Sequence, residues 1–193
     1  MQKIREDILG AAAVFGKTSA DIVYGEGPQG ARVMLVGEAP GAEETRLLRP
    51  FVGKAGKNLD EFLEVLSLSR GDIYITNVVK FRPFKVSEKG RLSNRPPAKE
   101  EIACMLPYLL REIEAVAPRV VVTLGNVPLK SLTGDSRIVI GACHAQCIPA
   151  AALTHEYTLF PLYHPASLIY NHALKTVYQQ DVECLKSYLF AVT

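Results

Sequence analysis

Four short segments rich in glycine and polar residues each follow a predicted β-strand. They are Gly37-Glu38-Ala39-Pro40-Gly41, Thr76-Asn77, Leu124-Gly125-Asn126 and Tyr163-His164-Pro165-Ala166-Ser167. The amide of Asn77 donates and accepts hydrogen bonds at once, and the imidazole of His164 suits the stabilisation of a developing negative charge. In an open parallel sheet, ligands bind in the crevice beyond the carboxyl ends of the strands. We therefore expect the four segments to converge on one pocket.

Three common kinds of site are not supported by the sequence. Gly53-Lys54-Ala55-Gly56-Lys57-Asn58 superficially resembles a phosphate-binding loop, but that motif requires glycine where Phe51 stands and serine or threonine where Asn58 stands. The glycines at 37, 41, 53 and 56 do not have the spacing of a dinucleotide-binding fingerprint. No serine lies on a nucleophile-elbow motif, so acyl transfer has little support.

The pattern of apolar residues predicts alternating strands and helices. Strands are expected at 32–36, 73–76, 120–124 and 158–162, and helical spacing links Leu59, Phe62, Leu63 and Leu66. Further helices are expected at 98–117 with Pro107 inside, at 126–132 with Asn126 as its cap, and at 173–190. The stretch 138–154 is predicted as a hairpin or an irregular excursion. Short apolar strands alternating with helices indicate an α/β fold with a mostly parallel sheet buried on both faces.

Length and composition bound the class of protein. At 193 residues the chain is expected to form a single domain over 1–193, with residues 1–25 forming a helix and loop packed on the sheet's edge. An apolar fraction of 48% and a charged fraction of 22% are typical of globular proteins. The sequence has no run of signal-peptide or membrane-spanning type, so a cytoplasmic location and no membrane partner are expected.

Charge is distributed unevenly, although the net charge is only +2. One short stretch holds six cations opposed only by Glu88. The six are Lys80, Arg82, Lys85, Lys89, Arg91 and Arg95. On charge alone this stretch is as compatible with a solvated loop as with a nucleic-acid contact.

Taken together and in order, the motifs resemble those of the uracil-DNA glycosylase superfamily. The likeness combines 37–41 with Glu43 and Glu44, then Pro50-Phe51-Val52-Gly53, Thr76-Asn77-Val78-Val79-Lys80, Leu124-Gly125 and His164-Pro165-Ala166, and it extends from about Val23 to Leu189. It is closest to the iron-sulfur branch, often called family 4. The resemblance implies a three-layer α/β/α fold with a central four-stranded sheet. Each motif alone also has a structural interpretation, as a turn, a helix cap or ordinary core.

The resemblance assigns roles within the expected pocket. Asn77 would read the Watson-Crick edge of uracil and reject cytosine, Phe51 would stack on the base, and Glu38 would crowd out the methyl group of thymine. His164 would stabilise the negative charge that develops on O2 of the leaving uracil. Gly37 and Ala39 would line the base site. Ala39 stands where the best-known branch has an aspartate, so Glu44 is a candidate for activating water, and Asn77 or a backbone carbonyl is the alternative group that would orient it.

DNA is the partner that the resemblance implies. Phosphate contacts are expected from the basic stretch and from the residues after His164, where Leu168 and Ile169 would wedge into the base stack. The expected DNA-contacting residues are Lys80, Arg82, Lys85, Arg91, Arg95, Ser167 and Leu168. A related branch forms a covalent bond through a histidine in the corresponding loop, but Asn94 stands at that position here, so covalent trapping is not expected.

The cluster ligands of the iron-sulfur branch are expected to be missing. Aligned outward from 23–27, the four cysteine positions are Gly10, Ala13, Phe81 and Cys104, so only one thiol remains. Phe81 and Cys104 are expected to provide apolar packing instead. Cys143, His144 and Cys147 form a weak alternative metal set without a fourth ligand, and no metal or cofactor is predicted.

The sequence therefore predicts a monofunctional DNA glycosylase that hydrolyses the N-glycosidic bond of deoxyuridine and leaves an abasic site in DNA, acting as a monomer. Two alternatives stay open. One is a protein of the same fold that binds damaged DNA or a nucleobase without cutting. The other is a glycosylase for another deaminated base, such as hypoxanthine or xanthine.

Overall fold

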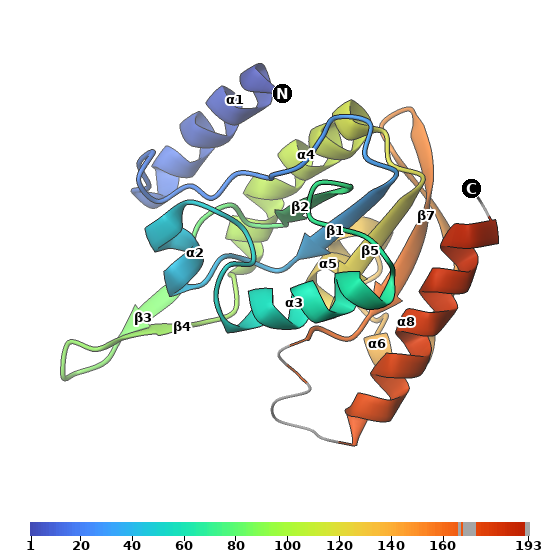
Figure 1. Cartoon of the computed structure of the whole chain (residues 1–193). Coiled ribbons are helices and arrows are strands. Elements are labelled where there is room, and N and C mark those ends of the chain that lie inside the picture. The colour runs from blue at the N-terminus through green and yellow to red at the C-terminus, as the bar shows by residue number, and fades with distance from the viewer. Residues whose placement is uncertain (166, 168–172, 192–193) are drawn as a thin grey trace.

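A five-stranded sheet lies at the centre of the computed structural model, which describes residues 1–165, 167 and 173–191. Its strand order is β2-β1-β5-β7-β6 (Figure 1). The bounds are β1 (Val33–Gly37), β2 (Ile73–Asn77), β5 (Val120–Leu124), β6 (Ile148–Ala152) and β7 (His155–Leu162). The first four strands of that order are parallel, as expected, and β6 pairs antiparallel with β7. The sheet therefore has one strand more than the four expected, because part of 138–154 forms a hairpin with β7.

The longer helices agree with the predicted ones, whereas the short helices at 42–47 and 140–143 were not expected (Figure 1). Leu59, Phe62, Leu63 and Leu66 are all buried, as their helical spacing indicated. The structure's helices are α1 (Gln2–Ala12), α2 (Ala42–Leu47), α3 (Lys54–Val65), α4 (Lys99–Val116), α5 (Asn126–Thr133), α6 (Ile140–Cys143) and α8 (Leu174–Ala191), with a 3₁₀ turn at Ala13–Phe15. Pro107 lies inside α4. Asn126 is not the cap of α5: that position is Gly125, and the Asn126 side chain instead accepts a hydrogen bond from Ile140 N at 2.8 Å.

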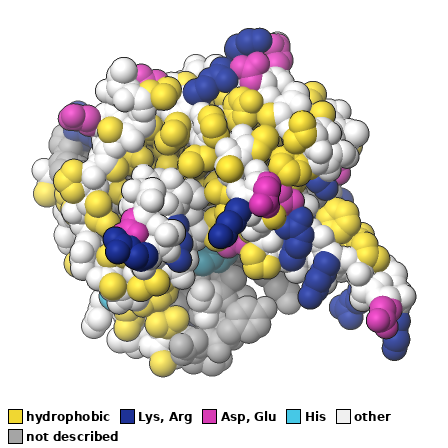
Figure 2. All heavy atoms as spheres, turned by 180° about the vertical axis from the view of Figure 1, so that it is seen from behind, with side chains coloured by type: hydrophobic (Ala, Val, Ile, Leu, Met, Phe, Trp, Pro, Cys, Tyr) yellow, Lys and Arg dark blue, Asp and Glu magenta, His cyan; other side chains and the backbone are white. Residues whose placement is uncertain are grey.

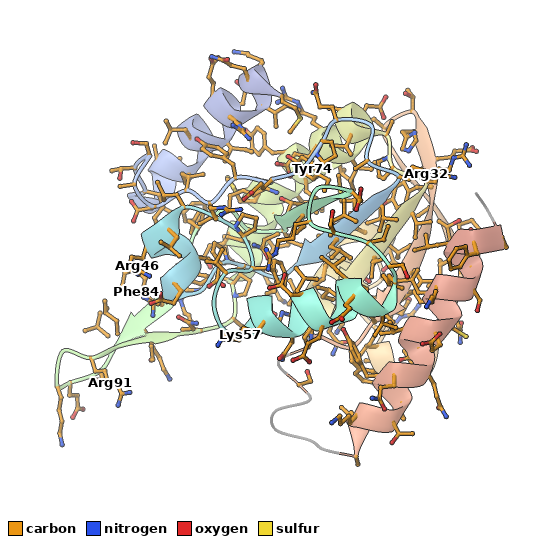
Figure 3. The ribbon with its side chains drawn as sticks, in the orientation of Figure 1. Arg32, Arg46, Lys57, Tyr74, Phe84 and Arg91 are labelled. Atoms are coloured by element: carbon orange, nitrogen blue, oxygen red, sulfur yellow. The ribbon has the colours of Figure 1, made fainter. Side chains whose placement is uncertain are left out.

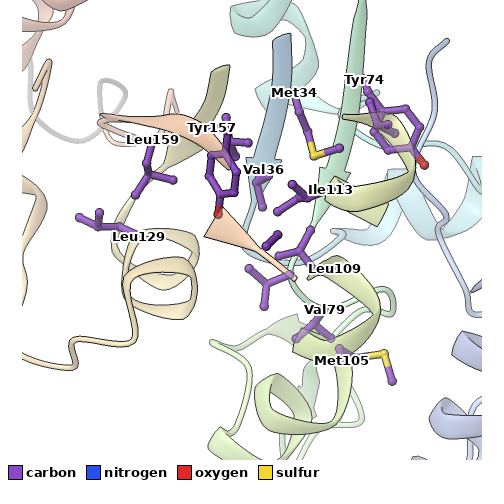
Figure 4. Close-up of a cluster of buried hydrophobic side chains, with 14 of the residues drawn as sticks. Met34, Val36, Tyr74, Val79, Met105, Leu109, Ile113, Leu129, Tyr157 and Leu159 are labelled. Atoms are coloured by element: carbon purple, nitrogen blue, oxygen red, sulfur yellow. The ribbon is translucent and has the colours of Figure 1, made fainter. Parts of the chain in front are cut away.

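The sheet separates two apolar cores, which gives the three-layer arrangement that the resemblance implied. Strand residues alternate between faces, so Met34 and Val36 face α4 whereas Val33 and Leu35 face α3 and α8. Figure 4 shows part of the core on the α4 side, where Met105, Leu109 and Ile113 of α4 meet the sheet. Strands β1, β2 and β5 are buried along their whole length and consist mostly of apolar residues, as is typical of a parallel sheet covered on both faces.

The N-terminal segment covers one edge of the sheet. Helix α1 packs on α4, where Arg111 and Asp7 form an ion pair of 2.9 Å. The chain then passes along β2 in the antiparallel sense, and Glu26 and Ile75 exchange backbone hydrogen bonds of 2.9 and 2.8 Å. Gly25 lies against the ring of Tyr74, where a Cβ would stand 2.5 Å from the ring. Within the described residues, no helix is long and apolar enough to cross a membrane.

A small hairpin projects from the body of the molecule at the carboxyl ends of the strands (Figure 1). It consists of β3 (Phe84–Val86) and β4 (Leu92–Asn94), paired antiparallel. Part of the basic stretch is therefore a paired ribbon rather than an irregular loop. We call 84–94 the arm.

Candidate active site

The ends of β1 and β2 bring three of the predicted site residues together. Gly37 and Asn77 are register partners at the last position of the two strands. A Cβ on Gly37 would overlap Asn77 Oδ1 and would stand 2.6 Å from Phe51 Cζ. The absence of a side chain at Gly37 therefore allows the amide and the aromatic ring to meet.

A cavity of about 330 Å³ opens at this point. It is lined by Ala39, Gly41, Ala42, Glu43, Glu44, Phe51, Gly53, Asn77, Asn94 and His164. Asn77 is only 3% exposed and Phe51 only 4%. The rings of Phe51 and His164 have centroids 6.2 Å apart and planes inclined by 26°, so they form one aromatic wall. The predicted amide, ring and imidazole thus share one cavity of a size that admits a small flat ligand.

Phe51 is held in a backbone conformation that non-glycine residues rarely adopt. Its φ is 52°, in the left-handed region. Arg70 Nη2 donates a 2.7 Å hydrogen bond to Phe51 O, and Arg70 is itself paired with Asp60 at 2.7 Å. Such local strain is found preferentially at functional sites. Sequence reasoning missed Arg70, whose role depends on contacts between residues distant in the chain.

Glu44 connects the two loops that form the mouth of the cavity. Its Oε1 accepts hydrogen bonds from the backbone of Val52 at 3.1 Å and Gly53 at 2.8 Å. Its Oε2 accepts one from Gly41 N at 3.1 Å. A carboxylate has about four acceptor positions, so three of them are used by backbone N–H groups. Glu44 therefore fixes the Phe51 loop to the start of α2 while its carboxylate lines the cavity.

His164 enters the cavity from the loop after β7. Burial lowers its pKa below the ordinary 6.5, and the nearby charge of Glu44 opposes this shift. The loop is held by Ser167 N donating to His164 O at 2.8 Å and by the Asn58 amide donating to Pro165 O at 3.3 Å. Gly125 has φ 91°, and a Cβ there would lie 3.4 Å from His164 Cβ. The Leu124-Gly125 segment thus converges with the other three.

Glu38 lies in a second cavity beside the first. This cavity measures about 350 Å³ and shares Ala39, Asn94 and His164 with its neighbour. Its remaining lining residues are Glu38, Pro40, Pro83, Arg95 and Ser167. Burial raises the pKa of Glu38. Glu38 was expected beside the base, and the structure places it across the shared wall of Ala39 and His164.

Two of the expected DNA-contacting cations are engaged inside the protein. The side chain of Lys80 is 0% exposed and pairs with Glu112, so the prediction that it contacts DNA is wrong. Arg95 forms a two-pronged ion pair with Glu101, both bonds being 2.7 Å. Arg82 Nε donates to Asn94 Oδ1 at 2.7 Å, at the base of the arm.

The other expected DNA contacts lie near the site, except for one that lies outside the described residues. Lys85 and Arg91 are exposed on the arm. Ser167 lines the second cavity. Leu168, like Ile169, falls among the residues that the structure does not describe.

The positions expected for iron-sulfur ligands do not form a cluster site. Gly10 and Ala13 are exposed, and a Cβ on Gly10 would meet nothing within 4 Å. Phe81 is fully buried, with its ring centroid 5.4 Å from that of Phe15. Cys104 Sγ lies 3.8 Å from Ala11 O. Three of the four positions offer no thiolate, so the donor set does not fit a four-cysteine cluster.

The remaining cysteines and histidine do not assemble a metal site among the residues with described placement. There, no group of three or more histidine, cysteine, aspartate or glutamate side chains is arranged to hold a metal ion. His144 Nδ1 contacts both carboxylate oxygens of Asp181 at 2.9 Å. Cys143 is buried in α6, whereas Cys147 and Cys184 are exposed.

The fold and this cavity together define a class of α/β proteins with a ligand site at the carboxyl ends of the strands. The chain belongs to the uracil DNA glycosylase superfamily, whose sequence profile matches residues 24–186. It is 35% identical to the type-4 uracil-DNA glycosylase of Sulfurisphaera tokodaii, over 96% of this chain and 83% of that protein. It is 38% identical to the type-4 uracil-DNA glycosylase of Pyrobaculum aerophilum, over 86% of this chain and 82% of the relative.

A solved structure confirms the fold independently of close sequence similarity. The crystal structure of Pedobacter heparinus SMUG2 superposes with a TM-score of 0.57. The superposition covers 84% of this chain and 76% of the other, at 13% identity. The two chains therefore share this α/β/α fold.

Proposed function

We propose that this protein is a monofunctional DNA glycosylase that hydrolyses the N-glycosidic bond of deoxyuridine, releases uracil and leaves an abasic site. Superfamily membership and the type-4 relatives support this activity. The observation that carries the proposal is the meeting of Asn77, Phe51 and His164 on one cavity at the strand ends. A glycosylase must hold a flipped base by its edge and by stacking, and these three side chains supply the groups needed.

Asn77 is the proposed reader of the base. Its amide NH₂ donates to O4 of uracil and its carbonyl accepts from N3–H, whereas cytosine presents the opposite pattern. Because Asn77 is 3% exposed, a mismatched amide would leave buried polar groups without partners. Phe51 supplies the stacking surface. Ala39, on the wall shared by the two cavities, bounds the space around C5, and Glu38 lies across that wall in the second cavity.

His164 is the proposed stabiliser of the leaving uracil anion. Its lowered pKa means that the ring is mainly neutral near pH 7, with one N–H to donate. A preorganised donor of this kind costs no reorganisation when charge develops on O2. Ala39 supplies no carboxylate for the water, so we assign that task to the acceptor position that Glu44 retains beside its three backbone bonds.

The arm is the proposed contact with DNA outside the pocket. Figure 2 shows Lys and Arg side chains along the projecting arm, and Figure 3 places Phe84 and Arg91 on it. Val86 is 61% and Leu92 50% exposed, and these register partners share one face. A two-stranded ribbon with exposed cations fits a DNA groove, where its cations meet phosphates.

We also propose that the protein works without an iron-sulfur cluster and as a monomer. Glycine, alanine and phenylalanine at three of the four ligand positions support the first point. Iron analysis and a visible absorption spectrum of protein purified without oxygen test it. The expected protein is colourless, and a brown protein with bound iron would contradict the proposal.

The activity is tested with a uracil-containing oligonucleotide whose abasic sites are cleaved by alkali. The parent protein is expected to cut it, while His164→Ala and Asn77→Ala each lose about a hundredfold to a thousandfold in rate. His155→Ala is the matched control, because His155 lies at the opposite end of β7 and contacts Pro118 O at 2.7 Å. No cleavage of single- or double-stranded substrate by the parent would refute the assignment.

The same assay distinguishes the two alternative functions. Stable binding of uracil-containing DNA with no base released would indicate a binding protein, an outcome compatible with the missing carboxylate at Ala39. Release of hypoxanthine or xanthine in preference to uracil would indicate a glycosylase for another deaminated base. A panel of oligonucleotides, each with one deaminated base, provides both readouts.

A further inference from the structure

Lys80 is a buried cation directly behind the base-reading residue. Its ammonium group donates to Asn77 O at 2.6 Å and to Thr76 Oγ1 at 2.6 Å. The third bond goes to the carboxylate of Glu112. All three ammonium protons thus have an acceptor, although the side chain is 0% exposed.

The partner of Lys80 comes from a distant part of the chain. Glu112 lies in α4, its side chain is 1% exposed, and it also accepts a 3.0 Å hydrogen bond from Thr76 Oγ1. Apolar side chains of α4, among them Met105, Leu109 and Ile113, pack between this helix and the sheet (Figure 4). A buried ion pair is often no more stabilising than apolar residues of the same volume. The burial of this pair is therefore only weak evidence for a role in stability.

The network lies on the other face of the sheet from the cavity. Successive strand residues point to opposite faces, so the Thr76 hydroxyl faces α4 while the Asn77 side chain faces Phe51 and Gly37. Strand β2 ends at Asn77, and Lys80 supplies a donor to the last carbonyl of the strand. The peptide group that carries the reading amide is thus tied to the interior of the protein.

We propose that Lys80, Glu112 and Thr76 form a positioning network that holds Asn77 in the orientation needed to read the base. This inference rests on the function proposed above and assigns specificity-determining residues that do not touch the substrate. The network acts on the backbone of Asn77, so its loss misplaces the amide relative to the base edge. Misplacement of a substrate-positioning group by about 1 Å can cost about a hundredfold in rate.

The decisive variant replaces both buried charges, Lys80→Met together with Glu112→Leu. Replacing both partners avoids leaving one charge buried alone, so the double variant is expected to fold. Its kcat for uracil release is expected to fall about tenfold to a hundredfold, and its affinity for free uracil, measured by calorimetry, to weaken by about tenfold. A folded double variant with the parental kcat and the parental uracil affinity would overturn the proposal.

A control separates positioning from general stability. Arg111→Met with Asp7→Leu removes the neighbouring α4 to α1 ion pair, which does not reach the cavity. This control is expected to keep the parental kcat and uracil affinity, measured well below its own Tm. Equal losses of kcat in both double variants would contradict a specific role for Lys80.

A milder variant decides the matter if the first double variant does not fold. Thr76→Val removes one hydroxyl at similar side-chain volume and leaves the Lys80–Glu112 ion pair in place. Its kcat and its affinity for free uracil are expected to fall below the parental values, and parental values of both in this folded variant would refute the network. A parent protein that binds free uracil but releases none would contradict the proposed hydrolysis while leaving the affinity comparison intact.

Discussion

The cavity and the packing around Phe81 differ in the space that they leave for a changed side chain, although both regions lie just after the end of β2. In the cavity, Gly37, Asn77 and Phe51 approach so closely that an added methyl group would displace one of them. Around Phe81, by contrast, Gly10 and Ala13 are exposed, and a ring contact with Phe15 fills the interior. Chemistry depends on the placement of a few polar atoms, whereas packing requires only apolar volume. The residues packed around Phe81 can therefore differ in type without a change in the geometry of the cavity.

The largest expected effect comes from the packing region and concerns stability alone. Phe81→Ala should lower the free energy of unfolding by about 3–5 kcal/mol, because a fully buried ring leaves a cavity. Urea denaturation measures this loss. The kcat of the folded protein should stay at the parental value, and a large fall in kcat would show that the two regions are coupled.

Gly37→Ala tests the cavity, where the expected effect is on activity rather than on stability. The new methyl group must displace the Asn77 amide or the Phe51 ring, so kcat/KM for uracil release should fall about a hundredfold. Gly10→Ala is the matched control: it lies in α1 with open space around it, so it should add about 1 kcal/mol of stability and leave kcat/KM unchanged. Equal values of kcat/KM for Gly37→Ala and Gly10→Ala would show that the cavity is no more sensitive to an added methyl group than α1.

Removing positive charges from the arm tests whether this surface element contributes to DNA binding but not to the chemical step. Lys85→Gln with Arg91→Gln should raise KM for DNA about tenfold, with kcat unchanged, because the cations act before the chemical step. The dependence of log K on log salt should become shallower by about 0.9 for each phosphate that the variant no longer neutralises. Lys3→Gln with Arg137→Gln removes two exposed charges elsewhere and should change neither quantity.

The smallest expected effect is the pH dependence of stability contributed by His164. Its pKa is lower in the folded protein than the ordinary 6.5, so the unfolded chain binds more protons as the pH falls through that range. Folding is therefore destabilised on acidification, and the contribution vanishes well above neutral pH. The drop in Tm between about pH 7.5 and about pH 5.5 should be smaller for His164→Gln than for the parent. A larger fall in Tm for His164→Gln than for the parent would contradict the expected destabilisation of the folded protein by protonation of His164.

Much of the fold was predictable because local patterns carry it. The four parallel strands agree with the predicted ranges to within a few residues, since each is a short apolar run bounded by turn residues. The convergence of Asn77, Phe51 and His164 on one cavity was also predictable, because strand ends of a parallel sheet share one edge. Strand β6 was predicted only in part, as one of two possibilities for 138–154, since Ile148-Pro149-Ala150-Ala151-Ala152 has no alternation of apolar and polar residues and becomes a strand by pairing with β7.

The wrong prediction for Lys80 has a physical reason. A lysine in a basic stretch is usually solvated, and its burial here depends on Glu112, which lies in a different helix. Arg70 was missed for the same reason, because its partners Phe51 and Asp60 are joined to it only by folding. Long-range polar pairs of this kind leave no periodic signal in the sequence.

Each edge of the central sheet carries an obstacle to strand addition within the described residues. On the β2 side, the segment around Glu26 already occupies backbone groups of the edge strand. On the β6 side, Pro149 has no N–H to offer a new neighbour. Open edges invite pairing between molecules and fibrous aggregation. These obstacles at the two edge strands therefore disfavour edge-to-edge pairing of two copies of the sheet.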